Sequence, residues 1–153
     1  MLVVIGCGNP VRSDDGAGIE VVRRLAAADD IDRDRVTLVD AGTSGMEVMF
    51  RVRDARRVVI VDACSSGGEP GAVYRLPARE AATPTEHGYS LHGLRWDHAL
   101  HAGRRMHGEG FLDHADVFLI EVACLDYGLE LSAAASRGVA RVVDEIARMV
   151  AAP

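Results

Sequence analysis

Three short apolar runs of this chain are each followed by a turn that contains both glycine and aspartate. The runs and the acids that follow them are Leu2–Ile5 with Asp14 and Asp15, Val36–Val39 with Asp40, and Val58–Val61 with Asp62. Short, continuously apolar runs that end at turn residues are typical of strands buried on both faces of a parallel sheet. The carboxyl ends of parallel strands share one edge of the sheet. We therefore expect these acids to converge on a single crevice.

The remaining segments complete an alternation of strands and helices. We expect helices over about 16–28, from a Ser44 cap to about Val52, over Ser90–Met106, and from a Ser132 cap to Val150; strands over 71–76 and 117–122; and irregular segments over 78–89 and 107–114. This order predicts an α/β fold, a three-layer sandwich with helices on both faces of a mostly parallel, twisted five-stranded sheet. The length fits a single domain over residues 1–153.

Charge and hydropathy narrow the classes of partner. The net charge of −6 repels phosphate backbones and argues against a nucleic-acid partner. No apolar run has the roughly 18 residues that span a bilayer, so we expect no membrane association. The start of the chain lacks the basic segment of a secretion signal, which predicts a cytoplasmic protein. The three cysteines are far apart and odd in number, and we expect them to be reduced.

The glycines after the first strand suggest a dinucleotide site, but their neighbours oppose it. Gly6 and Gly8 match the start of the Gly-x-Gly-x-x-Gly pattern, whereas the third glycine position is Val11. Pro10 removes a backbone N–H that a phosphate would need, and the acids at the start of the helix would repel a pyrophosphate. We expect no nucleotide cofactor.

A metal site is the second candidate, formed by Asp15, Asp62 and His92. Two carboxylates and one imidazole leave open positions on a borderline ion such as zinc or nickel. Each residue alone has an ordinary explanation, as a helix cap, a turn acid or a solvated histidine, but their shared sheet edge favours a site. His87 is held in reserve as a further ligand. For His98 and His101, a solvated helix face is the simpler explanation.

Cysteine nucleophiles are the third candidate. Cys7, Cys64 and Cys124 all fall at or near strand ends, so one of them could face the crevice. Buried cysteine is more often plain packing, and the nearby acids would raise rather than lower the pKa of a thiol.

Four motifs, in the same order and with the same separations, resemble the nickel-iron hydrogenase maturation endopeptidases. They are Gly6-Cys7-Gly8-Asn9-Pro10-Val11-Arg12-Ser13-Asp14-Asp15-Gly16-Ala17-Gly18, Asp40-Ala41-Gly42-Thr43-Ser44-Gly45-Met46-Glu47, Val61-Asp62-Ala63 and Ser90-Leu91-His92-Gly93. Leu131-Ser132 is similar to the closing motif of the family, and the resemblance spans about residues 2 to 150.

The resemblance implies an endopeptidase that removes a C-terminal extension from the hydrogenase large-subunit precursor after nickel insertion. The trio that contacts the metal and carries catalysis in the family falls on Asp15, Asp62 and His92; the loop implicated in substrate recognition falls on Asp40, Gly42 and Thr43. The implied metal is nickel supplied by the substrate, which zinc or cadmium can replace in vitro. The implied partner is the large-subunit precursor. The resemblance also implies that the enzyme is a monomer. One branch of the family has Glu at position 15, which makes Asp14 a rival ligand.

Several alternatives stay open at this point. The metal could act as a Lewis acid or lower the pKa of a water, or it could only license binding while an aspartate is the general base. The first turn is also similar to that of peptidyl-tRNA hydrolases, although the acids at Ser13–Gly16 replace the basic segment expected there. A third hypothesis is a chaperone that binds the nickel-loaded precursor without cutting it.

Overall fold

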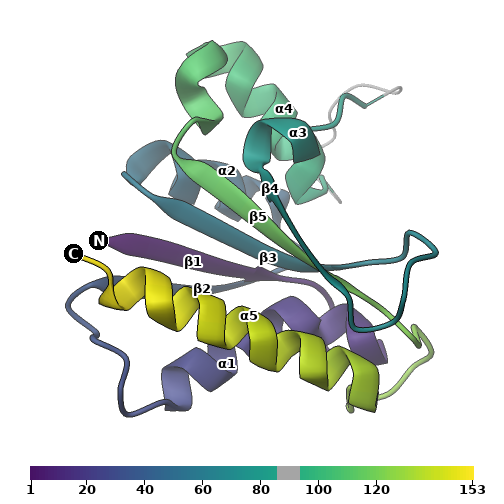
Figure 1. Cartoon of the computed structure of the whole chain (residues 1–153). Coiled ribbons are helices and arrows are strands. Elements are labelled where there is room, and N and C mark those ends of the chain that lie inside the picture. Colours follow the sequence, from purple (N-terminus) through teal and green to yellow (C-terminus); the bar gives the residue numbers. More distant parts are fainter. Residues whose placement is uncertain (86–93) are drawn as a thin grey trace.

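A single sheet organises the structure, a computed structural model that describes residues 1–85 and 94–153 (Figure 1). Within these residues five strands lie in the order β2-β1-β3-β5-β4. The strands are β1 (Leu2–Cys7), β2 (Val36–Gly42), β3 (Val58–Cys64), β4 (Val73–Pro77) and β5 (Ala115–Glu121). The first four strands in the spatial order are parallel, and only the edge strand β4 is antiparallel, to β5. The predicted mostly parallel α/β sheet is confirmed.

Helices cover both faces of the sheet. The helices are α1 (Ala17–Ala27), α2 (Gly45–Asp54), α3 (Ala78–Ala81), α4 (Trp96–His107) and α5 (Ala133–Ala151), with 3-10 turns at Ser13–Gly16 and Glu109–Leu112. Helices α1 and α5 pack together on one face, and α2 and α4 pack together on the other. No helix within the described ranges combines the length and apolar character needed to cross a membrane.

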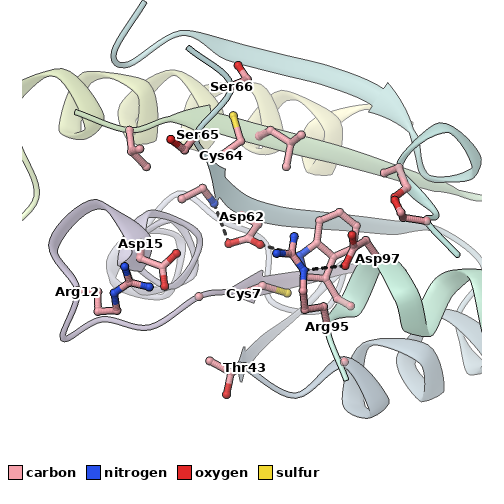
Figure 2. A pocket seen from close by; sticks show the side chains of 18 of the residues that line it. Cys7, Arg12, Asp15, Thr43, Asp62, Cys64, Ser65, Ser66, Arg95 and Asp97 are labelled. Carbon is pink, nitrogen blue, oxygen red and sulfur yellow. Dashed lines mark hydrogen bonds and ion pairs between the residues drawn. The ribbon is translucent and has the colours of Figure 1, made fainter. Parts of the chain in front are cut away.

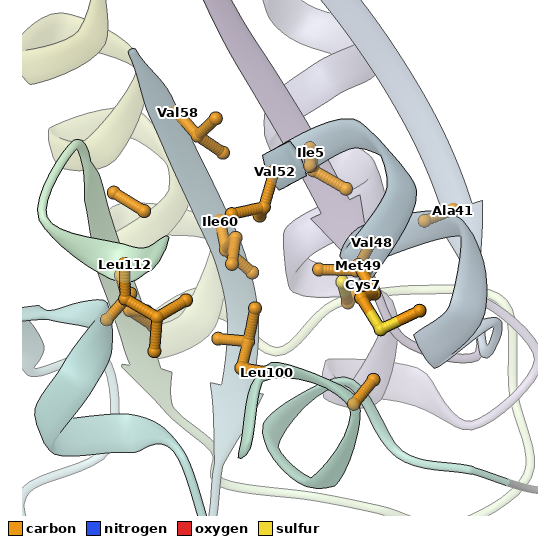
Figure 3. Packing of buried hydrophobic residues seen from close by; sticks show 14 of the residues in the cluster. Ile5, Cys7, Ala41, Val48, Met49, Val52, Val58, Ile60, Leu100 and Leu112 are labelled. Atoms are coloured by element: carbon orange, nitrogen blue, oxygen red, sulfur yellow. The ribbon is translucent and has the colours of Figure 1, made fainter. Parts of the chain in front are cut away.

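Each face of the sheet has its own apolar core, as the strand patterns predict. Figure 3 shows the core under α2 and α4, where Val48 and Val52 of α2 meet Leu100 of α4 over the strand residues Ile5 and Ile60. The opposite core joins α1 and α5 to the other side of the same strands. Strands buried from both sides hold the sheet edge, and the acids on it, on a rigid base.

Two predicted segments differ from the structure. The segment predicted as irregular over 78–89 begins with the short helix α3, whose first residue, Ala78, is fully buried. The helix predicted over Ser90–Met106 begins only at Trp96, because Arg95 has extended backbone angles and the Leu94 carbonyl accepts a hydrogen bond from the Gly45 N–H of α2. The predicted Ser90 cap lies outside the described residues.

Two glycines allow α1 to lie directly against the strand ends. A Cβ atom at Gly18 would lie 2.2 Å from the Val61 carbonyl oxygen, and one at Gly6 would lie 2.4 Å from the Gly18 carbonyl oxygen. No larger side chain fits such contacts. The glycines of the first motif therefore serve close packing of a helix on a sheet.

The chain reverses its direction of travel across the sheet between β1 and β3. Strand β2 lies on one side of β1, and the return through α2 places β3 on the other side. In open α/β sheets, ligands bind outside the carboxyl ends of the strands at such a switch point. The residues that follow β1 and end β3 are therefore the expected place for a site.

Candidate functional site

A crevice of about 750 Å3 opens at the carboxyl ends of β1, β2 and β3 (Figure 2). Asp15 and Asp62 both line it, together with Gly42 and Thr43. Its far wall comes from α3 and from the start of α4, including Arg95, Trp96 and Asp97. Of the four acids predicted to converge on one crevice, Asp15 and Asp62 line it, whereas Asp14 and Asp40 do not.

Asp15 is held by the tight turn that follows β1. The backbone N–H of Asn9 donates to Oδ2 of Asp15 at 3.0 Å, and the Asp15 N–H donates to the Arg12 carbonyl at 3.1 Å. Gly8 makes the turn possible because its φ is +128° and a Cβ there would lie 1.9 Å from the Asp15 carbonyl oxygen. The turn thus fixes the carboxylate at the crevice, while its Oδ1 accepts no hydrogen bond from residues 1–85 and 94–153.

Asp62 is the most perturbed carboxylate of the crevice. Burial raises the pKa of Asp62 to about 6, and the negative charge of Asp15 adds to this effect. Two hydrogen bonds oppose the rise: the indole N–H of Trp96 donates to Oδ2 at 2.6 Å, and the Ala63 N–H donates to Oδ1 at 2.8 Å. A carboxyl group with this pKa exchanges protons near neutral pH, as an acid–base catalyst requires.

Asp14, the rival ligand, is committed elsewhere. Its side chain is fully buried and accepts hydrogen bonds from the Ala123 and Cys124 N–H groups and from both the N–H and the hydroxyl of Ser132. Burial alone would raise the pKa of Asp14, but these bonds together lower it. Asp14 does not line the crevice. The structure therefore favours Asp15 as the residue that faces a ligand, with Asp14 as a clamp between the first turn and the start of α5.

His92 and the reserve candidate His87 lie outside the described residues, so the predicted metal trio stays a prediction. Within residues 1–85 and 94–153, no group of three or more His, Cys, Asp or Glu side chains is placed to hold a metal ion. Asp15 and Asp62 would supply two oxygen ligands and need a third from elsewhere.

Two other histidines, His98 and His114, form hydrogen bonds with backbone carbonyls. The Nδ1 of His98 bonds the Thr83 carbonyl, and the Nε2 of His114 bonds the Val52 carbonyl, both at 2.8 Å. His98 thus ties α4 to the segment after α3.

The predicted recognition loop only partly faces the crevice. Gly42 and Thr43 line it, and Gly42 has a φ of +53° with open space where a Cβ would stand. Its carbonyl accepts a hydrogen bond from the Gly8 N–H at 2.8 Å, which joins this loop to the first turn. Asp40 is exposed outside the crevice lining, and its Oδ1 accepts a bond from the Gly42 N–H. Asp40 therefore shapes the loop.

The cysteines that line the crevice are poor nucleophiles. Burial, followed by the charges of Asp62 and Asp40, raises the pKa of Cys7 well above its ordinary value. Burial and Glu121 raise the pKa of Cys64 to about 12, and its thiol donates to Glu121 Oε2 at 3.1 Å. All three cysteines are free thiols. The expectation that nearby acids suppress thiolate formation agrees with these pKa directions.

Two residues of importance were missed from the sequence. Trp96 donates a hydrogen bond to Asp62. The one feature of the sequence that could have marked Trp96 is that it is the only tryptophan of the chain. Glu121 is buried at the end of β5, and hydrogen bonds from Cys64, Ser66 and Gly68 outweigh burial and lower its pKa to about 2. The feature of the sequence that could have marked Glu121 is its position as an acid inside the apolar run 117–122. Glu121 fixes the loop after β3, which forms another wall of the crevice.

The fold places two carboxylates, Asp15 and Asp62, in a crevice at the switch point of an α/β sheet. The family model described as hydrogenase maturation protease matches residues 19–149. This chain belongs to the hydrogenase maturation protease family.

Relatives with curated names are consistent with this assignment. The chain is 28% identical over 130 residues to the hydrogenase expression/formation protein HupD of Rhizobium leguminosarum, covering 84% of this chain and 61% of the relative. It is 32% identical over 83 residues to the coenzyme F420 hydrogenase subunit delta of Methanothermobacter thermautotrophicus, covering 52% of each chain. The chain therefore spans about half to three fifths of the length of these relatives.

Solved structures share the fold. The crystal structure of the NiFe hydrogenase maturation protease HycI from Thermococcus kodakarensis superimposes with a TM-score of 0.75 at 21% identity, covering 99% of this chain and 92% of that chain. The hydrogenase maturating endopeptidase HybD from Escherichia coli gives a TM-score of 0.76 at 21% identity, covering 95% and 88%. Family membership also favours a peptidase over the peptidyl-tRNA hydrolase alternative.

Proposed function

We propose that this protein is an endopeptidase that removes the C-terminal extension of a NiFe hydrogenase large-subunit precursor. The observation that carries the proposal is the placement of Asp15 and Asp62 in one open crevice of a hydrogenase maturation protease fold. A crevice of about 750 Å3 can admit several residues of extended chain. Its two carboxylates can serve the proton transfers that amide hydrolysis requires.

Asp62 is the proposed acid–base residue. Its pKa of about 6 lets it take a proton from an attacking water and return one to the leaving amine near neutral pH. Trp96 and the Ala63 N–H hold both carboxylate oxygens in place, so the group is oriented before substrate arrives. Asp15, fixed by the Asn9 N–H, supplies the second carboxylate.

Nickel enters this proposal as part of the substrate. A nickel-loaded precursor would present its ion to Asp15, Asp62 and His92, so that only a loaded precursor completes the site. A bound ion can polarise a carbonyl or lower the pKa of a water. The carboxylate pair is suited to a divalent cation, since Asp62 carries a negative charge above its pKa.

The test compares nickel-loaded with nickel-free precursor. Each is incubated with the purified protein, and the products are weighed by intact-protein mass spectrometry. The proposal predicts a shortened large subunit and a released peptide only from the loaded form. Binding of the loaded precursor without any change in mass would instead support the chaperone hypothesis.

A further inference from the structure

The wall of the crevice next to Asp15 is built from two segments joined by their backbones. The Gly128 N–H donates to the Val11 carbonyl, and the Ser13 N–H donates to the Gly128 carbonyl, both at 2.9 Å. The Ser13 hydroxyl donates to the Asp126 carbonyl at 2.7 Å. The segment after β5 is thus tied to the turn after β1.

Hydrogen bonds anchor this wall at both ends of the segment after β5. Asp14 accepts bonds from Ala123 and Cys124 before that segment and from Ser132 after it. Ser13 has a φ of +50°, a conformation that costs free energy in a residue with a side chain. The surrounding bonds maintain this strained geometry.

On this anchored wall, three large apolar side chains are exposed. Tyr127 is 89% exposed, Leu129 is 82% exposed and Val11 is 46% exposed. Among the large apolar residues that the structure describes, Tyr127 and Leu129 are the two most exposed. We call these three side chains the rim patch. Holding apolar side chains out in water on an ordered backbone is unfavourable for an isolated protein and is typical of interaction sites.

The rim patch borders the crevice, although none of its three residues lines it. Arg12, between Val11 and Ser13, lines the crevice, and so does Leu125, which precedes the segment of Tyr127. In Figure 2, Arg12 lies beside Asp15 at the crevice mouth. A protein whose chain enters the crevice would bring its neighbouring surface against the rim patch.

Charges around the rim patch define the partner's chemistry. Asp126 and Glu130 flank Tyr127 and Leu129, and Arg12 adjoins Val11. All three charged residues are exposed and have no side-chain ion pair within residues 1–85 and 94–153. These acids oppose an anionic lipid surface. Together with the cation of Arg12, they fit a protein surface that carries an apolar spot between basic and acidic side chains.

We propose that the rim patch is a docking surface for the folded body of the precursor, separate from the crevice that receives its C-terminal segment. The proposal rests on the proposed function for the identity of this partner. A patch of aromatic and aliphatic anchors on an anchored backbone loses little conformational freedom on binding. Docking here would bring the cleavable segment to the crevice mouth.

The test uses the double variant Tyr127→Ser with Leu129→Ser, and Met106→Ser as a matched control. Met106 is 69% exposed and lies near the end of α4, roughly 15 Å along the helix from Trp96. Cleavage of nickel-loaded precursor is followed by mass spectrometry to obtain KM and kcat. Dissociation constants are measured by biolayer interferometry on immobilised precursor, with each protein also carrying Asp62→Asn so that the precursor stays intact.

The double variant should raise KM and the dissociation constant at least tenfold with kcat within about twofold, because truncating two interface anchors typically has this effect. Met106→Ser should change neither. Binding by the double variant that equals the binding of the Asp62→Asn protein alone would overturn the docking surface. A protein that binds through the rim patch but never cleaves would instead refute the proposed function alone. A dimer that the double variant dissolves in sedimentation velocity would assign the patch to self-association and overturn the proposal.

Discussion

The indole N–H of Trp96 donates a 2.6 Å hydrogen bond to Oδ2 of Asp62, which joins the start of α4 to the end of β3. This bond favours the charged carboxylate, whereas burial and the charge of Asp15 favour the neutral one. The balance leaves the pKa of Asp62 at about 6. This value is close to neutral pH, where a general acid or base transfers protons most effectively. The start of α4 therefore tunes the acid that ends β3.

Replacing Trp96 with Phe should raise the pKa of Asp62 above 6, because the charged form loses its indole donor while the aromatic ring is kept. We expect a rise of about one pH unit, the size associated with one bond to a charged group. An NMR titration of the Asp62 carboxyl carbon measures it, and the acid limb of the cleavage profile should move to higher pH in parallel. A pKa that stays the same or falls would show that Trp96 does not set it.

Replacing Asp62 with Asn should change how stability depends on pH. In the wild-type protein the folded-state pKa of about 6 lies above the ordinary value of 3.8. The folded state therefore holds this proton more tightly than the unfolded state does. Its stabilising effect is complete below about pH 4 and is lost as the pH rises through 6, with a cost on the order of 3 kcal/mol at most.

Urea unfolding of both proteins at pH 4, 5, 6 and 7 measures this effect. The free energy of unfolding of Asp62→Asn minus that of the wild type should increase across this range, because other titrating groups cancel in the difference. A difference that is constant with pH would contradict the raised pKa of Asp62.

Substitutions of the neighbouring residues Asp14 and Asp15 should affect different properties: the first mainly lowers stability, and the second mainly lowers activity. Asp14→Asn should lower the free energy of unfolding by about 3 kcal/mol, because it leaves buried donors without their charged acceptor. Asp15→Asn should lower it by less than about 1 kcal/mol, since the amide oxygen can still accept from the Asn9 N–H. Yet Asp15→Asn should abolish cleavage. Equal losses of stability in urea unfolding would place both acids in the clamp.

Gly8→Ala should disrupt the turn that holds Asp15. Its Cβ would lie 1.9 Å from the Asp15 carbonyl oxygen, so the turn must move. Gly108→Ala is the matched control, because Gly108 also has a positive φ, +100°, but has open space around it. The control should cost about 1 kcal/mol of backbone strain and keep full cleavage, whereas Gly8→Ala should cost more and lose cleavage. Equal effects of the two variants would contradict a close fit at Gly8.

The sequence predicted the parts of the site that depend on strand ends. Asp15 and Asp62 follow apolar runs, and the sheet edge they share follows from parallel topology. The role of Asp14 was not predictable, because its donors Ala123, Cys124 and Ser132 lie more than one hundred residues away in sequence. Tertiary contacts of this kind leave no local periodicity.

The start of α4 shows a second limit. The pattern from Ser90 to Met106 favours a helix throughout, but Arg95 is extended and Trp96 begins the helix. The contact of the Leu94 carbonyl with Gly45 and the bond of Trp96 to Asp62 fix this boundary. Both partners belong to other elements, so helix propensity alone could not place it. Glu121 also depends on another element, because donors from the loop after β3 balance its buried charge. The sequence around Glu121 alone could not show this.

The most direct test of the central claim is cleavage of nickel-loaded precursor by the wild type, Asp15→Asn, Asp62→Asn and Asp54→Asn, followed by intact-protein mass. Asp54 is an exposed aspartate at the end of α2, outside the crevice lining, and serves as the control. The wild type and Asp54→Asn should shorten the precursor at the same rate, while Asp15→Asn and Asp62→Asn slow cleavage at least a hundredfold with the fold intact. Wild-type rates from either crevice variant would contradict the account.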